Sequence, residues 1–413
     1  MSSPYAHRPY LSLYAPRYAL EILNNPSGWA ASIGTGSLVA NTGQSLVCSR
    51  AASAYVTLAD GSLRYLGANT IRTEVPGILV EGASINDCLN SQTIGATGWT
   101  NYDSIGTTTY TANTTDVLAP DGTHTSTKAV FPANSGSGNY NFTTQQVGTF
   151  GGAAHTFSFY GRTASGTVTL YLQDFTNFGS WLACVLTTTW QRFQFTWTAS
   201  PSNYRTIGWD SRDSTLPTTF AGGTCYLWQG QDELGTFATS PIITTTIPVT
   251  RDADIVYVAN PLTGSETTFF VQCSFLGLPG STGWGENIAS LIGRYLVVDS
   301  SFPGTGSWTQ YLSADALAVG MYYDPTGAAQ VTYATVDTGP LYDKHIIRGT
   351  VNTVSPGEDM FVDSSITKYG TGQLLPAPPR SVGANITLGN RLNGSRPANG
   401  WLSNIIVDPS YGP

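Results

Sequence analysis

Trp190-Gln-Arg-Phe-Gln-Phe-Thr-Trp197 alternates polar and aromatic residues from its third position onward. A period of two places the aromatic residues on one face of an extended chain, which is the pattern of a half-buried β-strand. Thr156-Phe-Ser-Phe-Tyr160 and Val168-Thr-Leu-Tyr-Leu172 alternate in the same way, and Ala164-Ser-Gly-Thr167 between them predicts a hairpin turn. These segments predict antiparallel sheets with an aromatic core, which we expect Trp228 to join.

The composition extends this prediction to the whole chain. Of 413 residues, 45 are Gly and 23 are Pro, and only 11% are charged. Thr, Val, Tyr, Phe and Trp favour pleated sheets, whereas frequent Gly and Pro interrupt regular segments and favour many short strands. We predict an all-β fold of tandem antiparallel β-sandwiches.

Four segments are expected along the chain. They are an N-terminal region (residues 1–85), a first sandwich (residues 86–243), a linker (residues 244–250) and a second sandwich (residues 251–413). Alternation predicts strands of the second sandwich at Thr267–Phe275, Gln330–Val336 and His345–Val351.

Charge and hydropathy exclude two classes of partner. The formal net charge is −8 and the chain has three Lys without any basic run, whereas nucleic-acid binding requires clustered Lys and Arg. No apolar run approaches the roughly 18 residues needed to cross a bilayer, and Met1–Arg8 does not resemble a secretory signal. We expect no nucleic-acid partner and no membrane insertion.

The N-terminal region carries a specific motif. Ser49–Asn69 reads as two short strands around the turn Asp60-Gly61, and Pro76-Gly-Ile-Leu-Val-Glu-Gly-Ala83 follows as another strand. This segment resembles one that recurs in surface proteins of tailed bacteriophages. The resemblance implies a fibre or spike protein of a phage or phage-like particle.

Both sandwiches add to this resemblance. The first resembles the carbohydrate-binding-module-like jelly rolls of phage appendages, through its Pro120-Asp-Gly-Thr123 turn, its Trp190–Phe193 strand and its final Cys225–Glu233 strand. The second resembles concanavalin-A-like and laminin-G-like domains, through Asp359–Ser365 and Gly400–Asp408. Ser364 stands where that family usually has Gly, so the hairpin turn there is expected to differ.

The resemblance implies a role on the virion surface. Tyr residues mixed with Pro near the N-terminus would form a virion-docking arm; they are Tyr5, Tyr10, Tyr14 and Tyr18. The expected partners are other virion structural proteins and a host cell-surface polysaccharide. Attachment to a symmetric particle favours a homo-oligomer, with a trimer among the options. Such a protein would be assembled in the host cytoplasm and released by lysis.

Aromatic residues in Gly- and Ser-rich segments are the candidates for glycan binding. Trp and Tyr stack against the C–H faces of pyranose rings, and residues in loops have less reason to be buried than those on alternating strands. The candidates are Trp181, Trp284, Trp308 and Tyr311. The alternative role for each is a structural anchor or a subunit contact.

The sequence contains no pattern typical of a catalytic site, a metal site or a redox-active cysteine pair. A glycosidase needs two carboxylates that face each other across the sugar, but Glu358 and Asp359 point to opposite faces of a strand. We therefore predict no catalytic residue, no cofactor and no metal, with a structural Ca²⁺ held by Asp121 and Glu233 as the alternative. The five Cys are scattered, and Cys184 and Cys225 are expected to be reduced and buried, with a disulfide as the alternative.

Three functions remain open at this point. The first is a virion surface protein that binds host glycan during adsorption. The second is a purely structural capsid or tail decoration protein without a ligand. The third is a polysaccharide-degrading tailspike, which would require paired carboxylates in a cleft.

Overall fold

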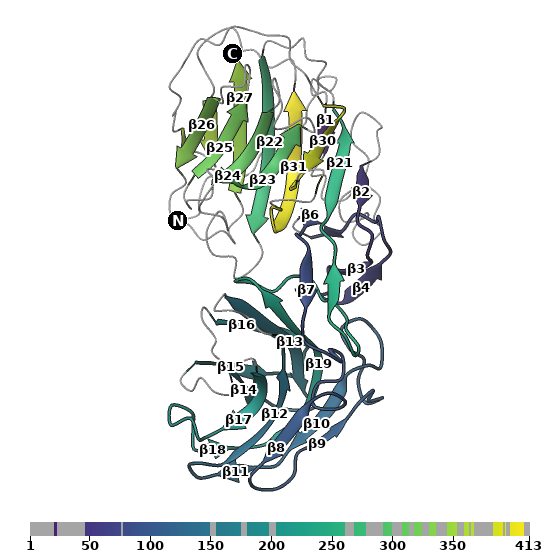
Figure 1. Ribbon diagram of the computed structural model, residues 1–413, viewed down its shortest axis with the longest axis vertical. Helices are drawn as coiled ribbons and strands as arrows, with labels where there is room; N and C mark the ends of the chain where they lie inside the picture. Colours follow the sequence, from purple (N-terminus) through teal and green to yellow (C-terminus); the bar gives the residue numbers. More distant parts are fainter. Residues whose placement is uncertain are drawn as a thin grey trace, which may run out of the picture.

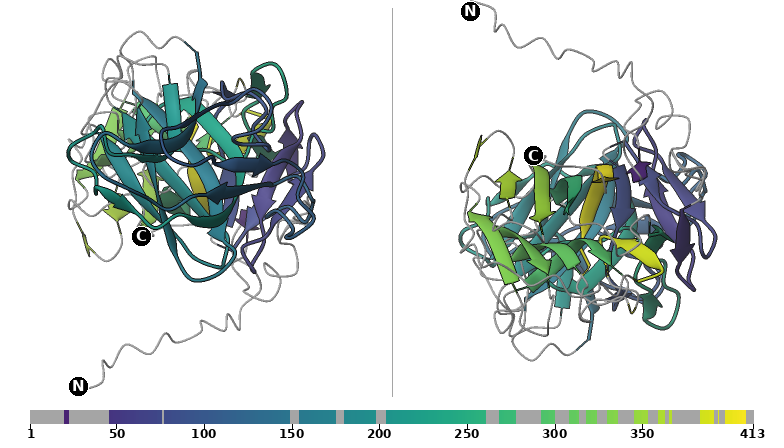
Figure 2. Two further views of the ribbon diagram at one scale, coloured as in Figure 1. Left: turned by 90° about the horizontal axis from the view of Figure 1, so that it is seen from below. Right: turned by 90° about the horizontal axis from the view of Figure 1, so that it is seen from above.

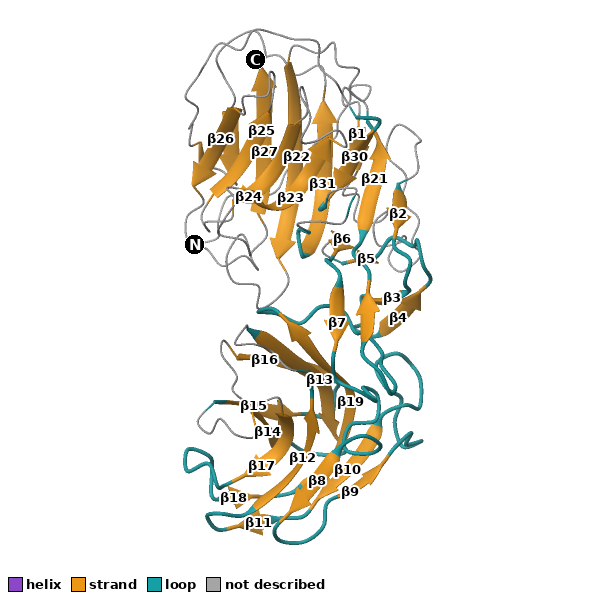
Figure 3. Cartoon of the chain, in the orientation of Figure 1, coloured by secondary structure: helices purple, strands orange, loops and turns teal. Residues whose placement is uncertain are grey.

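The computed structural model describes residues 20–22, 46–75, 77–148, 154–174, 180–197, 204–260, 268–277, 292–299, 308–313, 318–323, 330–335, 345–352, 359–362, 365–366, 383–390, 393 and 397–408. All regular structure in these residues is β-strand (Figure 3), so the all-β prediction is confirmed for them. The described residues contain no helix that could cross a membrane. Two stacked bodies lie along the long axis (Figure 1).

The first sandwich consists of two five-stranded antiparallel sheets, and we call it the jelly-roll sandwich. The β13 sheet contains, in spatial order, β16 (Gln191–Trp197), β13 (His155–Thr163), β19 (Gly223–Leu234), β10 (Thr127–Phe131) and β9 (Thr109–Thr111). The β12 sheet contains β15 (Trp181–Leu186), β14 (Val168–Asp174), β17 (Tyr204–Asp210), β12 (Tyr140–Gln146) and β8 (Thr100–Asp103). A small pair, β11 (Asn134–Ser135) with β18 (Thr219–Phe220), lies beside them.

The predicted aromatic core fills the space between these two sheets. Trp197 is buried, and Phe193 and Phe195 pack against the same core cluster. Trp228 is also fully buried, but it lies in a separate cluster with Tyr55.

The predicted hairpin at Ala164–Thr167 is wrong. The two strands that flank it, β13 and β14, belong to different sheets of the sandwich. The connection therefore crosses from one sheet to the other. Period-two alternation is the same in either arrangement, which is why the sequence pattern does not distinguish them.

The second sandwich contains an eight-stranded and a seven-stranded sheet. The first consists of β29 (Ser365–Ile366), β28 (Asp359–Val362), β27 (His345–Asn352), β22 (Thr268–Gly277), β31 (Gly400–Asp408), β6 (Gly77–Val80) and β5 (Thr73–Glu74), with β1 (Leu20–Ile22) also paired to β31. The second consists of β2 (Val47–Ser49), β21 (Ile255–Ala259), β30 (Asn385–Leu388), β23 (Ile292–Asp299), β24 (Trp308–Ser313), β25 (Ala318–Tyr323) and β26 (Gln330–Thr335).

The N-terminal region is not a separate unit, contrary to the expected boundary at residue 85. Strands β1 and β6 pair with β31, and β2 pairs with β21, so three N-terminal strands complete sheets of the second sandwich. Seen from above in Figure 2, the purple N-terminal strands lie along one side of the molecule. Within the described residues, this region is therefore part of the C-terminal body.

The jelly-roll sandwich is consequently an insertion into the second sandwich. The chain leaves through β7 (Ser84–Asn86) and returns through β20 (Val249–Arg251), and these two strands pair antiparallel. Residues 244–250, expected to be a plain linker, are partly structured, because Thr244 bonds to Ser91 of the outgoing chain. The two bodies are thus joined by a double crossing (Figure 1).

The predicted Asp60-Gly61 turn is confirmed. It connects β3 (Ala54–Thr57) to β4 (Leu63–Leu66), which pair antiparallel, and Gly61 has a φ of 81°. The Asp60 carboxylate accepts hydrogen bonds from the amide and hydroxyl of Ser62, which fixes the turn. Tyr55 and Leu63 of this hairpin pack against Trp228 of the jelly-roll sandwich. The hairpin therefore bridges the two bodies.

Candidate functional site

A buried ionic network holds the N-terminal strands to the start of the second sandwich. Asp254 accepts from Arg50 at 2.6 Å and from Arg72, while Glu81 accepts from Arg72 at 2.6 Å and lies 3.3 Å from Arg251. All five side chains are almost fully buried. Burial alone would raise the pKa of Glu81, but Arg251 and Arg72 lower it to about 2. The network is therefore ionised at neutral pH.

Glu81 also connects this network to the jelly-roll sandwich. Its two carboxylate oxygens accept from the amide and hydroxyl of Ser240, at 2.8 and 2.6 Å. Ser240 lies in the segment that leaves β19, and its neighbour Thr239 donates to Glu233. Ser84 beside the crossing also donates to Glu233, at 2.6 Å. These contacts bind the two bodies together.

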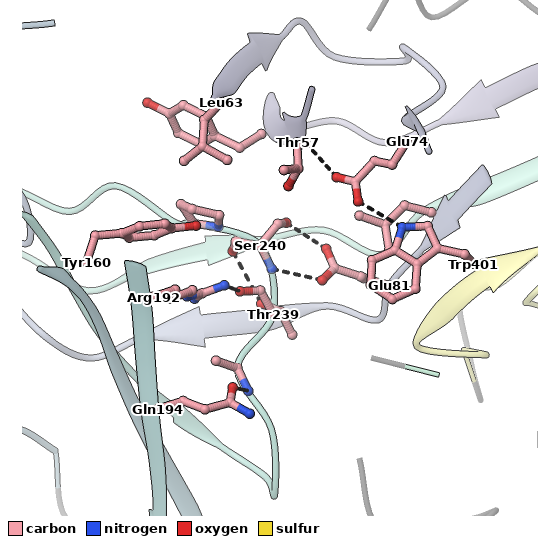
Figure 4. Close-up of a pocket in the computed structure, with 14 residues that line it drawn as sticks. Thr57, Leu63, Glu74, Glu81, Tyr160, Arg192, Gln194, Thr239, Ser240 and Trp401 are labelled. Atoms are coloured by element: carbon pink, nitrogen blue, oxygen red, sulfur yellow. Dashed lines mark hydrogen bonds between the residues drawn. The ribbon is translucent and has the colours of Figure 1, made fainter. Parts of the chain in front are cut away.

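A cavity of about 300 Å³ lies where the two bodies and the β3–β4 hairpin meet (Figure 4); we call it the junction cavity. Its lining residues come from six separate stretches of chain. They are Tyr55, Thr57, Leu63, Glu74, Leu79, Glu81, Tyr160, Arg192, Gln194, Ala238, Thr239, Ser240, Pro241 and Trp401. Aromatic rings and hydrogen-bonding groups thus face one partly open cavity, as in small-molecule pockets.

Glu74 and Trp401 form the wall nearest the second sandwich. The indole of Trp401 donates to Glu74 at 2.8 Å, and the amide of Thr57 donates to the other carboxylate oxygen at 2.6 Å. Burial raises the pKa of Glu74, and these two hydrogen bonds offset part of that effect. Glu74 therefore retains its proton to higher pH than an exposed Glu.

Arg192 and Tyr160 form the opposite wall, on neighbouring strands of the β13 sheet. The two residues are register partners, and the guanidinium carbon lies 5.5 Å from the centre of the Tyr160 ring. Arg192 donates to the carbonyl of Thr239 at 2.6 Å and to the hydroxyl of Ser158 at 2.9 Å. Arg192 therefore anchors the segment after β19 to the sheet.

The two cavity carboxylates do not form a glycosidase pair. Their environments push the pKa of Glu74 up and that of Glu81 down, which is the division of roles expected of an acid and a base. However, both oxygens of Glu81 already accept hydrogen bonds from Ser240, and Arg72 pairs with it as well. A carboxylate held in this way is a poor nucleophile or base. Its contacts are those of a structural group.

Trp181 belongs to a second region, on the outer face of the β12 sheet. It pairs with Gln173, packs edge-on against Tyr171 with ring centres 5.5 Å apart, and donates to the hydroxyl of Thr215 at 2.8 Å. Leu170 and Leu172 are fully buried, so alternation places Tyr171 and Gln173 on the opposite face of the strand. Tyr171 is nevertheless buried and belongs to the same core cluster, against which Trp181 packs. Gln173 is buried, and its amide nitrogen has no hydrogen-bond partner among the described residues. We call Trp181, Tyr171 and Gln173 the Trp181 cluster.

The other predicted glycan-binding residues are only partly placed. Trp308 and Tyr311 lie on strand β24 and not in a loop, and Trp181 likewise begins a strand, so the expectation of loop positions is wrong for these three. Trp284 lies outside the described residues, as does the predicted docking set Tyr5, Tyr10, Tyr14 and Tyr18. Glycan binding and virion docking by these residues stay predictions.

The residues weighed for metal and redox chemistry are engaged elsewhere. Asp121 bonds to Tyr55 and Thr123, whereas Glu233 bonds to Ser84 and Thr239, so the two carboxylates serve different contacts. The described residues contain no cluster of His, Cys, Asp and Glu that could hold a metal. All five Cys lie in the described residues, where they are buried and form no disulfide. Burial raises the pKa of Cys184 and of Cys225 to about 12.

Comparisons with known proteins add only slight similarity. No family model and no curated protein matches the chain. The N-terminal tandem CBM22 domains of Xyn10C from Paenibacillus barcinonensis share 10% identity with it, covering 80% of this chain and 97% of theirs, with a TM-score of 0.24. Domains LG4-5 of the mouse laminin alpha1 chain share 10%, covering 80% and 89%, with a TM-score of 0.25. Similarity this slight says nothing about function.

The junction cavity was not anticipated from the sequence. Its lining residues include Thr57 and Trp401, which lie at opposite ends of the chain. One usable signal in the sequence was the polar pair Arg192 and Gln194 on strand β16. The alternation that sends their aromatic neighbours into the core sends these two to the outer face.

Proposed function

We propose that the protein is a surface protein of a tailed phage or phage-like particle that binds host glycan during adsorption. The N-terminal motif and the two sandwich resemblances support the particle assignment. An all-β architecture of two β-sandwiches is compatible with it. In this proposal other virion proteins and host polysaccharide are the partners, and several copies of a weak sugar site act together through avidity.

The observation that carries glycan binding is the Trp181 cluster. A half-buried indole lies directly opposite Gln173, whose buried amide nitrogen lacks a partner among the described residues. An unsatisfied buried donor costs about 1–3 kcal/mol, and a sugar hydroxyl beside the indole would satisfy it. The half-buried indole supplies apolar surface for the face of the sugar, and the buried ring of Tyr171 supports the indole edge-on.

Two experiments on the intact protein test the proposal. Purified protein is incubated with host cells and with extracted surface polysaccharide, and bound protein and released reducing ends are recorded together. We expect binding without release. Release would favour the polysaccharide-degrading alternative, and absence of both signals would favour the purely structural one.

A matched pair of tryptophan variants locates the site. Trp181→Ala should weaken polysaccharide binding about tenfold or more, because stacking on an aromatic ring is lost. Trp190→Ala is the control, since Trp190 is also half-buried and donates its indole N–H, to Leu118, but precedes β16 of the other sheet. Equal effects of the two variants would contradict this placement. Trp284, Trp308 and Tyr311 are the next positions to substitute.

A further inference from the structure

Arg192 brings a positive charge to the wall of the junction cavity without a carboxylate partner. It forms no ion pair among the described residues, and it uses two N–H donors, on Thr239 and Ser158. A guanidinium has five donors, and the Nε of Arg192 has no partner among the described residues. By contrast, the network arginines Arg50, Arg72 and Arg251 each face Glu81 or Asp254.

Tyr160 stands beside this charge with an unused hydroxyl. Its hydroxyl makes no hydrogen bond to any other described residue, whereas that of Tyr55 donates to Asp121 at 3.1 Å. Figure 4 shows the hydroxyl end of Tyr160 directed toward Ser240 on the cavity wall. One cavity wall therefore combines a cation, a hydroxyl and an aromatic ring.

Neither of the two carboxylates in the cavity, Glu74 and Glu81, neutralises the charge of Arg192. Glu81 is compensated by Arg72 and Arg251. Glu74 is fastened by Thr57 and Trp401, and burial raises its pKa, so its negative charge is disfavoured. An anion that enters the cavity would meet Arg192 as the cation without an anionic partner.

We propose that the junction cavity binds a single carboxylated sugar ring, with the carboxylate on Arg192 and the ring against Tyr160. A charge-assisted hydrogen bond to guanidinium suits a carboxylate, and the aromatic ring suits the C–H face of a pyranose. The volume of about 300 Å³ is at the lower end of ligand pockets, which favours one ring over a longer chain. The choice of a sugar rests on the proposed function, but the site is separate from the Trp181 cluster.

The test uses glucuronic acid and glucose with the intact protein, measured by calorimetry or by saturation-transfer NMR. We expect glucuronic acid to bind at least tenfold more tightly than glucose. Arg192→Gln should weaken glucuronic acid binding by roughly tenfold or more, because a charged hydrogen bond is lost. Arg192→Lys should restore part of it, and Tyr160→Phe should weaken it severalfold.

Arg162→Gln is the matched control. Arg162 lies two residues after Tyr160 on the same strand, is half-buried and forms no ion pair among the described residues, but it does not line the cavity. It should bind glucuronic acid like the unsubstituted protein. Thermal melting checks that Arg192→Gln remains folded, and Tyr160→Phe gives a second test that leaves the Thr239 contact in place.

Equal binding of the two sugars, or unchanged binding in both Arg192→Gln and Tyr160→Phe, would overturn the proposal. Polysaccharide adsorption without glucuronic acid binding would refute the cavity site and leave the proposed function standing. Glucuronic acid binding lost with Arg192→Gln, but without adsorption to cells or polysaccharide, would refute the proposed function and support the cavity site.

Discussion

At the scale of single residues, the junction depends on charges that have no access to water. Removing one partner of a buried ion pair typically costs about 3–5 kcal/mol, because the other charge stays buried and unpaired. Glu81 is the clearest case, since it faces Arg72 and Arg251 and also accepts from Ser240. Replacing Glu81 should therefore weaken its contacts in both bodies and lower the stability of the protein.

The ionisation of Glu81 predicts a loss of stability in acid. Its pKa falls from 4.5 to about 2 in the folded protein, so its contribution is complete above pH 4.5 and is lost as the pH falls toward 2. The shift corresponds to about 3 kcal/mol. Melting temperatures between pH 7 and pH 2 should show that Glu81→Gln is much less stable at pH 7, with the difference shrinking in acid.

Asp116→Asn is the control for this experiment. Asp116 pairs with Lys128 at 2.7 Å, but Asp116 is exposed and Lys128 is partly exposed, so the pair contributes little. Its melting curve should follow that of the unsubstituted protein at every pH. A constant difference between Glu81→Gln and the unsubstituted protein from pH 7 to pH 2 would show that Glu81 does not stabilise the junction through its charge.

At the scale of elements, local sequence predicts strands better than it predicts their partners. The strands around Phe157, Leu170 and Phe195 were expected from alternation and are present. The error at Ala164–Thr167 concerned only which strands pair, because alternation records the buried face and not the neighbouring strand. Turns with a specific chemical signature, such as Asp60-Gly61, were predictable because positive φ selects Gly locally.

Two glycines of the jelly-roll sandwich allow the cost of positive φ to be measured separately from the cost of a steric clash at the added Cβ. Gly122 has a φ of 79° with open space at its missing Cβ, whereas Gly222 has a φ of 67° and a Cβ there would lie 2.5 Å from the carbonyl oxygen of Phe131. Gly122→Ala should cost about 1 kcal/mol from positive φ alone. Gly222→Ala should cost distinctly more, measured as a larger drop in melting temperature. Equal drops would mean that the backbone near Phe131 yields easily.

At the scale of the whole molecule, the organisation follows from pairings that span most of the chain. Ile78 of β6 pairs with Leu402 of β31, and Cys48 of β2 pairs with Val256 of β21. No local sequence pattern predicts such long-range contacts, which is why the sequence alone indicates a separate N-terminal region. The junction cavity was missed for the same reason, since it exists only once Thr57, Arg192 and Trp401 have been brought together.

The insertion predicts opposite behaviour for two fragments. Residues 86–248 contain both sheets of the jelly-roll sandwich, and their ends are adjacent because β7 and β20 pair. A unit with adjacent ends and its own core is expected to fold alone. Residues 46–248 add strands β2 to β7 but lack β21 and β31, so the otherwise buried Ile78, Leu79 and Val80 lose their cover.

We expect the shorter fragment to be monomeric and to melt cooperatively, while the longer one binds a hydrophobic dye and aggregates, because unpaired strand edges and apolar side chains promote association. Size-exclusion chromatography, circular dichroism and dye fluorescence measure these differences. A third chain, in which a short Gly-Ser turn connects residue 86 to residue 249, should recover a folded second sandwich, since β6 and β2 regain their partners. If the longer fragment folded as well as the shorter one, the N-terminal region would be an independent unit after all, and the junction cavity would lie between two separable domains.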